Sequence, residues 1–344
     1  MIKKSFITDC EGPLTLNDNA YEIASNFIEN GDEFFKIVSK YDDYLVDVLK
    51  KSDYHAGDTL KLIAPFFKAY GLNNEGVINF SKNNILLTNG AIETLKLASL
   101  NLKSFIISTS YGQYIEALCN HINFPLENTY YTKLDLDSYD LVVDEKEKII
   151  EFKDIVLNGD FKELERIFFD EIPNMAIGKL TDSVKTVGGQ GKKIAMDDIV
   201  NKHDLDLSGI MYVGDSITDV EPLRFIHENN GLSVSFNGNE YSLKEAEIAI
   251  ISEDTIATSL LIDLHSKFNK DYVLEFVKSY SKDPKRAFES FRIGFSLIDD
   301  FYHIFKGKDL PIIELITDDN ISNLRKKSIK MRKSIRGKNI GALG

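Results

Sequence analysis

The chain has 344 residues, of which 43% are hydrophobic, and it carries a formal net charge of −13. This length and apolar content allow a large core and predict two or three domains rather than one. The acidic balance argues against nucleic-acid binding by the whole protein, so we expect no nucleic acid among its partners.

Cysteine usage and hydropathy indicate the compartment. The two cysteines, Cys10 and Cys119, imply no disulfide framework and fit a reducing cytosol. The first residues lack the long apolar stretch of a signal peptide, and no segment approaches the length of a membrane span. We therefore expect a soluble, cytoplasmic protein with no membrane span.

The charge is distributed unevenly along the chain. Residues 321–344 carry eight basic side chains and no acidic one, which leaves 33 basic against 54 acidic groups, or −21, in the rest. This basic tail predicts either a frayed, solvated terminal helix or a contact with an acidic partner, nucleic acid or a membrane surface.

The first half of the chain predicts a strand followed by helices. Residues 5–8 are a short apolar run, as in a buried strand. From 18 to 70 the apolar residues recur with helical spacing, which predicts a helical block inserted between two strands. Residues 104–110 predict a second core strand that ends in hydroxyl side chains. The helices predicted beside that strand cover 91–100 and 114–120.

The second half alternates strands with helices. Residues 130–155 alternate or cluster apolar side chains as strands do, whereas the Thr-, Gly- and Ser-rich segment 179–191 predicts a loop or flap. Residues 265–344 predict added helices that Pro311 interrupts. The remaining predicted helices are 161–169 and 192–200, and the remaining predicted strands are 210–213, 231–238 and 248–251. This order predicts an α/β protein with a Rossmann-like parallel sheet and helices on both faces.

Two carboxylate-bearing turns follow predicted strands about two hundred residues apart. Asp9 and Glu11 follow the first strand, and Asp215 and Asp219 follow the strand 210–213. Parallel strands bring such turns together at the carboxyl edge of the sheet, where open α/β folds place their sites. Carboxylates gathered there repel one another, and their hard oxygens suit Mg²⁺. The sequence therefore predicts a magnesium site at this edge.

The order of four elements resembles the haloacid dehalogenase-like superfamily of phosphohydrolases. An acidic strand end at Asp9 and Glu11 comes first, then a strand end with Ser108, then Lys192, and last the complete motif 214–219, Gly-Asp-Ser-Ile-Thr-Asp. The resemblance covers roughly residues 1–16 and 86–260. Segments 17–24 and 237–240 are similar to the phosphoserine phosphatase-like branch, and the Asp-Cys-Glu-Gly-Pro form of the first motif resembles archaeal members.

The resemblance implies a domain organisation. It places a haloacid dehalogenase-like α/β core at 1–16 and 84–264, with an enlarged insertion at 129–173. A helical cap would occupy 17–83, and a helical C-terminal extension with the basic tail would occupy 265–344. The C-terminal helices are also the surface at which we expect a protein partner or a second copy of the chain.

The resemblance also implies roles for individual residues. Asp9 would be the nucleophile that forms an aspartyl-phosphate, and Glu11 would protonate the leaving oxygen and then activate water. Lys192 would neutralise the nucleophile and the transferring group, while Ser108 would hydrogen-bond a phosphate oxygen. The Mg²⁺ ligands would be the carboxylates of Asp9 and Asp215 and the backbone carbonyl of Glu11, with Asp219 acting through water or orienting Lys192.

Several of these residues have a structural alternative. Asp9 and Asp219 could each cap a helix, as an Asp at a strand-to-helix turn often does. Thr109 competes with Ser108, and Lys193 competes with Lys192. Asp18 stands where the phosphoserine branch has an acid that reads the substrate's amine, but it also fits the N-cap of a helix that starts near Asn19.

Glu11 departs from the pattern, because phosphatases of this family usually have Asp there. The longer side chain keeps the acid function but shifts it, and a misplacement of about 1 Å costs on the order of a hundredfold in rate. We expect a Mg²⁺-dependent phosphatase that acts on a small phosphorylated metabolite. The alternative is a weakly active or non-catalytic relative that serves as a regulatory or assembly subunit.

Overall fold

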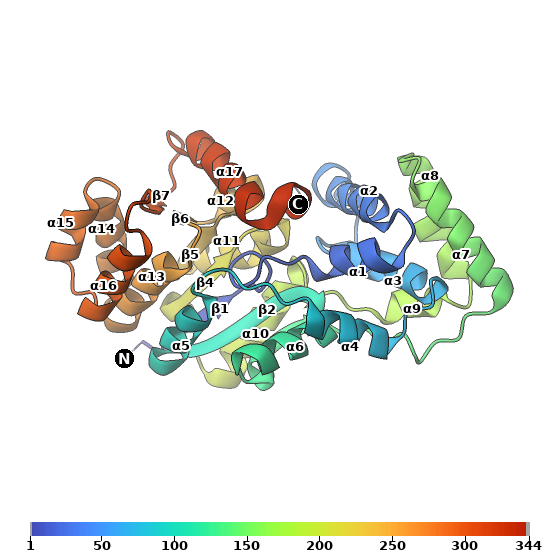
Figure 1. The fold of residues 1–344 in the computed structure, drawn as a ribbon, viewed down its shortest axis with the longest axis horizontal. Coiled ribbons are helices and arrows are strands. Elements are labelled where there is room, and N and C mark those ends of the chain that lie inside the picture. The colour runs from blue at the N-terminus through green and yellow to red at the C-terminus, as the bar shows by residue number, and fades with distance from the viewer. Residues whose placement is uncertain (1, 342–344) are drawn as a thin grey trace. The chain divides into compact units, whose positions relative to one another are not determined.

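The computed structural model describes residues 2–341 and contains a seven-stranded sheet with strand order β3-β2-β1-β4-β5-β6-β7 (Figure 1). The central pairs are parallel, and β7 pairs antiparallel with β6 at one edge. The strands are β1 (Ser5–Thr8), β2 (Lys103–Tyr111), β3 (Thr129–Thr132), β4 (Ile210–Gly214), β5 (Leu232–Phe236), β6 (Ile248–Ile251) and β7 (Ile312–Leu315).

The register of the central strands aligns the two acidic turns. β1 pairs with β4 from Ser5 opposite Ile210 to Thr8 opposite Val213, and both strands are buried along their whole length. Strands buried on both faces read as continuous apolar runs, which is why the sequence predicted them. Because the pairing is parallel and in step, Asp9 and Asp215 leave their strands at the same edge of the sheet.

The chain divides into two compact units. The first contains residues 2–16, 86–107 and 192–341, and the second contains 17–85 and 108–191. The division of the chain into core, cap and C-terminal extension at the boundaries given above stays a prediction, since these units group residues 108–191 with 17–85.

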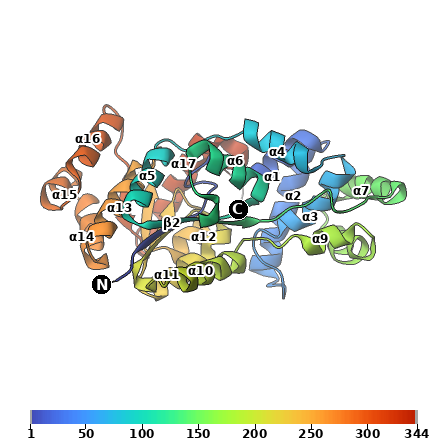
Figure 2. The same ribbon diagram turned by 90° about the horizontal axis from the view of Figure 1, so that it is seen from below.

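In the first unit, helices cover both faces of the sheet. Figure 2 shows α5 (Ala91–Asn101) and α13 (Ile256–Lys267) on one side and α10 (Gln190–His203) and α11 (Val220–Glu228) on the other. The remaining helices of this unit are α12 (Glu240–Glu245), α14 (Lys270–Tyr280), α15 (Pro284–Ser290), α16 (Phe295–Ile304) and α17 (Ile321–Ile340).

The second unit is mainly helical and has an aromatic core. The rings of Phe34 and Phe66 lie 4.7 Å apart, and the ring of Tyr41 lies 5.0 Å from that of Phe161. Its helices are α1 (Asn19–Phe27), α2 (Gly31–Asp43), α3 (Thr59–Ala69), α4 (Asn74–Asn83), α6 (Gly112–Ile122), α7 (Val143–Val156), α8 (Phe161–Arg166) and α9 (Gly178–Ser183).

Three expectations for secondary structure were wrong in part. Residues 130–155 form a strand only to Thr132, and α7 follows, because its apolar residues Ile149, Phe152 and Val156 recur with helical spacing and are buried. The segment 179–191 is not all loop, since α9 covers its start. The C-terminal region contains β7 in addition to helices.

The parallel α/β sheet itself is confirmed. Within residues 2–341, none of the helices combines the length and the hydrophobicity that a bilayer crossing requires.

Candidate active site

Three aspartates meet at the carboxyl edge of the sheet. Asp9 follows β1, Asp215 follows β4, and Asp219 ends the short 3₁₀ turn after it. One carboxylate oxygen from each lies within 4.8 Å of the other two. The three residues are 4%, 2% and 0% exposed, so their charges are held almost out of water. Such burial is costly unless cations compensate for it.

Lys192 supplies the first compensating charge. Its Nζ lies 2.8 Å from Asp9 Oδ2 and donates to Asp219 Oδ1 at 2.7 Å. The residue is fully buried in the first turn of α10. Lys193 points elsewhere, because it pairs with Asp197 at 2.6 Å and lies over the ring of Phe225. The structure thus brings Lys192, and not Lys193, to Asp9.

Asp219 is the most fully hydrogen-bonded of the three acids. Its Oδ1 accepts from Lys192 and from the Tyr212 hydroxyl at 2.6 Å, and its Oδ2 accepts from the backbone N–H groups of Asp215 at 2.9 Å and Ser216 at 3.1 Å. With Ser216 it forms a capping box at the 3₁₀ turn. The Asp219 side chain therefore both caps the 3₁₀ turn and contacts Lys192.

These contacts separate the pKa values of two neighbouring carboxyls. Burial and repulsion from Asp219 raise the pKa of Asp9 well above its usual range, although Lys192 opposes the shift. Burial would also raise the pKa of Asp219, but Lys192 and the hydrogen bonds outweigh burial and lower it. Burial alone would lower the pKa of Lys192, but Asp219 and Asp9 hold it above its ordinary value. Lys192 is therefore a permanent cation in this site.

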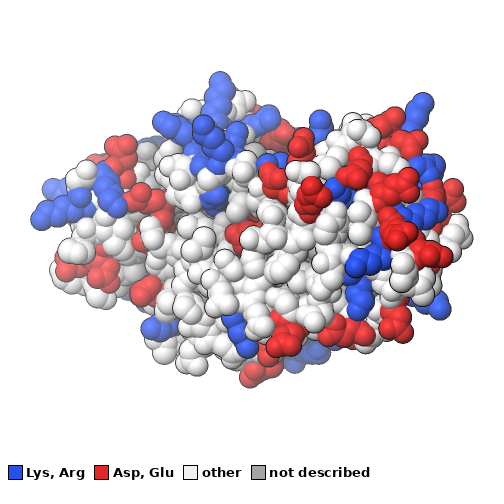
Figure 3. Space-filling view, turned by 45° about the vertical axis from the view of Figure 1, so that its right-hand side comes forward, with Lys and Arg blue, Asp and Glu red and all other residues white. Residues whose placement is uncertain are grey.

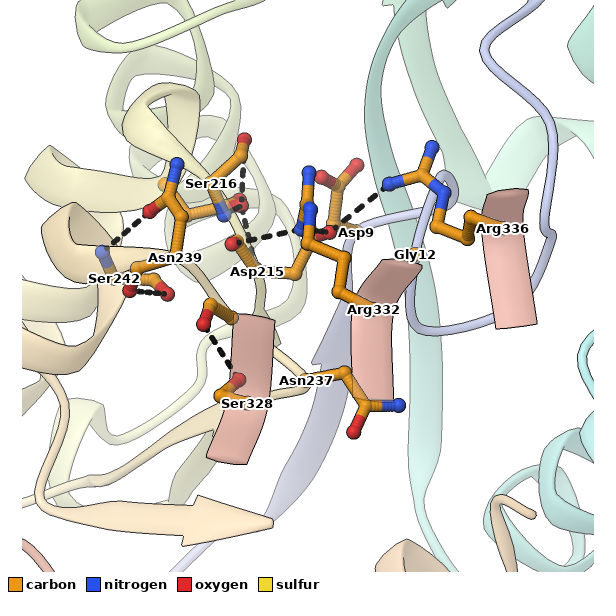
Figure 4. A network of polar contacts seen from close by, with 12 residues as sticks. Asp9, Gly12, Asp215, Ser216, Asn237, Asn239, Ser242, Ser328, Arg332 and Arg336 are labelled. Atoms are coloured by element: carbon orange, nitrogen blue, oxygen red, sulfur yellow. Dashed lines mark hydrogen bonds and ion pairs between the residues drawn. The ribbon is translucent and has the colours of Figure 1, made fainter. Parts of the chain in front are cut away.

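Asp215 takes its cations from the C-terminal helix. Arg332 Nη1 donates to Asp215 Oδ2 and, at 3.2 Å, to the Asp215 backbone carbonyl. Arg336 Nη1 lies 3.3 Å from the same Oδ2, and its Nε donates to the carbonyl of Leu16 at 3.1 Å. Figure 4 shows both guanidinium groups pointing toward the Asp215 carboxylate. Burial raises the pKa of Asp215, while Arg332 and Arg336 oppose that rise.

Gly12 leaves room for Asp215. Its φ is +104°, a conformation that side chains rarely adopt, and a Cβ built there would stand 2.1 Å from Asp215 Oδ2. The turn that carries Asp9 therefore passes close to the second acidic turn because a glycine is present. The Gly12 carbonyl accepts a hydrogen bond from the Thr88 hydroxyl at 3.2 Å, which ties this turn to the segment around Thr88 in the same unit.

The other predicted site residues are placed as follows. Glu11 is half-buried in the turn after β1, where it forms an isolated bridge with Thr15. Ser108 is buried in β2, two residues past Ile106, the strand partner of Thr8, and its Oγ accepts from the N–H of Ser110 at 3.1 Å.

Thr109 and Asp18, the remaining two predicted site residues, differ in their hydrogen bonds. Thr109 Oγ1 is buried without a hydrogen-bond partner among residues 2–341. Asp18 is the N-cap of α1 and accepts from the N–H of Tyr21 at 3.0 Å, so its predicted cap role is confirmed. Both Ser108 and Thr109 belong to the second unit, and Asp9 belongs to the first.

Three residues at the site were missed from the sequence: Tyr212, Arg332 and Arg336. Tyr212 looked like one more apolar residue of a strand. The prediction of a solvated tail was wrong for Arg332 and Arg336, because their side chains are each only 4% exposed. A signal was present, because 324, 328, 332 and 336 recur every four residues and thus share one face of a helix, and the first of them is leucine.

Comparisons with known proteins bear on the fold. No family model matches the sequence, and no curated protein matches it. A solved structure of a gene product from Archaeoglobus fulgidus is 27% identical over 99% of both chains, with a TM-score of 0.80.

More distant matches include a phosphoserine phosphatase in its apo form. It is 17% identical, with a TM-score of 0.48, over 74% of this chain and 96% of that one. Another is a haloacid dehalogenase family hydrolase from Salmonella enterica, 13% identical with a TM-score of 0.46, over 70% and 64% of the two chains. At so low an identity, these matches do not assign the activities of these proteins to this chain.

The parallel sheet, the helices on its two faces and the acidic turns at its carboxyl edge form a Rossmann-like α/β fold, so the predicted α/β fold class is confirmed. The donor set also fits a hard divalent cation. Three carboxylate oxygens from two neighbouring strand ends lie within reach of one ion, which suits Mg²⁺.

Proposed function

We propose that this protein is a Mg²⁺-dependent phosphatase that hydrolyses a small phosphorylated metabolite through an aspartyl-phosphate on Asp9. The observation that carries the proposal is the buried triad of Asp9, Lys192 and Asp219. It places a permanent cation 2.8 Å from a carboxylate oxygen, at the sheet edge where a second strand adds Asp215. An anionic nucleophile can attack an anionic phosphate only where positive charge offsets their repulsion.

The proposed reaction has two steps, transfer of the phosphoryl group to Asp9 and hydrolysis of the aspartyl-phosphate. A carboxylate oxygen of Asp9 attacks phosphorus while the bond from phosphorus to the ester oxygen breaks, and Glu11 gives its proton to that oxygen. Water then attacks phosphorus and loses a proton to Glu11 while the bond from phosphorus to the Asp9 oxygen breaks, so that inorganic phosphate leaves and the Asp9 carboxylate returns.

Two supporting roles follow from the contacts. Lys192 holds the nucleophilic oxygen of Asp9 and neutralises charge, and Asp219 fixes Lys192 through its hydrogen bond. Ser108, with Thr109 as the alternative, would bind a phosphate oxygen. Asp9, Asp215, Asp219 and the Glu11 carbonyl would hold the metal, which supplies charge neutralisation for the phosphoryl group.

The test is turnover of a panel of phosphomonoesters with Mg²⁺ by the wild type and by Asp9→Asn. We expect the wild type to release phosphate and the variant to lose about a thousandfold or more of kcat. Asp197→Asn is the matched control, since that carboxylate pairs with Lys193 in the same helix, and it should keep wild-type rates. Full activity in Asp9→Asn would refute the mechanism, and no turnover by the wild type would favour a regulatory or assembly subunit.

A further inference from the structure

Two arginines of the C-terminal helix α17 enter the candidate active site. Arg332 and Arg336 are four residues apart, so they lie on one face of the helix, and their side chains are each 4% exposed. Both contact Asp215, whose carboxylate lies within 4.8 Å of that of Asp9. The remaining basic residues of α17 are exposed and form the group of Lys and Arg side chains at the top of Figure 3.

Docking of the helix does not account for these two arginines. Leu324 packs with Leu243, Ala249 and Ile251, and the Ser328 hydroxyl donates to the Gly238 carbonyl at 2.6 Å. These contacts already fasten α17 to the first unit. Apolar side chains at 332 and 336 would extend them without the cost of taking two guanidinium groups out of water. The arginines are therefore better explained by something that they bind.

The charge of the site indicates what that ligand is. When all six groups are ionised, Asp9, Asp215 and Asp219 contribute three negative charges, and Lys192, Arg332 and Arg336 contribute three positive ones. The protein groups alone are thus balanced, and a divalent cation would leave an excess of two positive charges. A phosphoryl dianion cancels that excess. Without the two arginines, the same dianion would bring two uncompensated negative charges into a buried site.

We propose that Arg332 and Arg336 are phosphate-binding residues, which select a dianionic phosphoryl group and hold it beside Asp9. This inference rests on the proposed function, because it assigns the anion to the same site. The planar guanidinium matches the oxygens of a phosphate in a bidentate geometry, which an ammonium does not. The C-terminal helix is then part of the active site rather than an appendage to it.

The experiment measures binding of inorganic phosphate by calorimetry in the presence of Mg²⁺, with no turnover required. The variants are Arg332→Gln, Arg336→Gln and the control Lys333→Gln, which removes one charge from the exposed face of the same helix. We expect each arginine variant to bind phosphate about tenfold to a hundredfold more weakly, the value of a charged hydrogen bond. The control should bind as the wild type does.

Unchanged or tighter phosphate binding by both arginine variants would overturn the proposal, and tighter binding would mean that the arginines only obstruct the site. Arg336→Lys separates charge from shape, because it should recover only part of the affinity. Circular dichroism melts identify any variant that fails to fold, and Arg336 near the end of the helix keeps the test open if Arg332→Gln does fail. Weaker phosphate binding together with an inactive wild type would refute the proposed hydrolysis and leave this anion site standing.

Discussion

At the scale of single residues, Lys192 joins the two carboxyls whose pKa values diverge. Replacing it with methionine removes the cation that Asp9 and Asp219 share and leaves their charges buried. We expect Lys192→Met to lower the free energy of unfolding by about 3–5 kcal/mol at pH 7, as breaking a buried ion pair does. Urea denaturation of the variant and the wild type measures this difference in the free energy of unfolding.

Lys193→Met is the matched control for that change. Its ion pair with Asp197 is partly exposed, so it contributes about 0.3–0.5 kcal/mol. Equal destabilisation by the two variants would show that the burial of Lys192 does not set its contribution.

Glu11 permits a test that separates acid catalysis from other effects. If Glu11 protonates the leaving oxygen, Glu11→Gln should lower kcat/KM for an alkyl phosphate by about 10²–10⁴-fold. The same variant should lose much less kcat/KM with p-nitrophenyl phosphate, whose leaving group departs without a proton, because kcat/KM reports the steps up to departure of the leaving group and not the later attack of water. Steady-state kinetics with both substrates supply the comparison, and an equal loss with both would argue against the acid role.

The sequence predicted those site residues that lie in the turns directly after predicted strands. Asp9 and Asp215 each follow a strand-like apolar run and Asp219 lies in the turn after the second, so the edge at which they meet could be deduced from parallel pairing alone. Tyr212 could not be found in this way, since a tyrosine inside an apolar run looks like core. Arg332 and Arg336 were assigned to a solvated tail, because which face of a terminal helix is buried depends on contacts distant in sequence.

At the scale of elements, α17 depends on Leu324 for its place on the first unit. The residue is 1% exposed and belongs to a cluster with Leu243, Ala249 and Ile251. We expect Leu324→Ala to cost about 2–4 kcal/mol in the free energy of unfolding, through lost burial and the cavity left behind. Lys326→Ala, on the exposed face, should change it by less than about 0.5 kcal/mol. A loss below about 1 kcal/mol for Leu324→Ala would mean that α17 is not docked as described.

Helix α2 contains a buried acid that makes stability depend on pH. Burial raises the pKa of Asp42 to about 7 from its ordinary value of 3.8, although Tyr54 and the Gly57 N–H oppose the rise. Between these two values the folded state holds a proton that the unfolded state lacks, so this residue's contribution to stability falls as pH rises.

Asp42→Asn removes that titration and retains an oxygen to accept from the Gly57 N–H, which lies 3.0 Å from Asp42 Oδ2. We expect the difference in unfolding free energy between variant and wild type to increase from pH 4 to pH 7 in favour of the variant. Denaturation curves across that range measure the difference, and a constant difference would contradict the raised pKa.

The errors at this scale have a common origin. The strands β1, β4, β5 and β6 were predicted because both of their faces are buried. α7 was read as strand because β-branched and aromatic residues such as Ile149 and Phe152 favour strands locally, whereas burial of its helical stripe decided the outcome. β7 was missed because a short edge strand after Pro311 has no distinctive period.

At the scale of the whole molecule, the basic tail offsets the acidity of the rest of the chain, and its effect reaches the buried acids. Deleting residues 321–344 removes Leu324 from the core and both arginines from Asp215. Of the three cations that contact the buried aspartates, Lys192 then remains. We expect the truncated protein to melt at a lower temperature than the wild type and to be stabilised more by Mg²⁺, since a site richer in negative charge binds the cation more tightly.

The matched control keeps α17 but removes charge from its exposed face. A quadruple variant with glutamine at 326, 327, 330 and 333 loses four positive charges and retains Arg332 and Arg336. Its melting temperature should rise with Mg²⁺ by as much as that of the wild type, because exposed charges are screened by salt. If the quadruple variant instead responds to Mg²⁺ as the truncation does, the overall charge of the tail governs metal affinity. If only the truncation responds more strongly, the two buried arginines govern it.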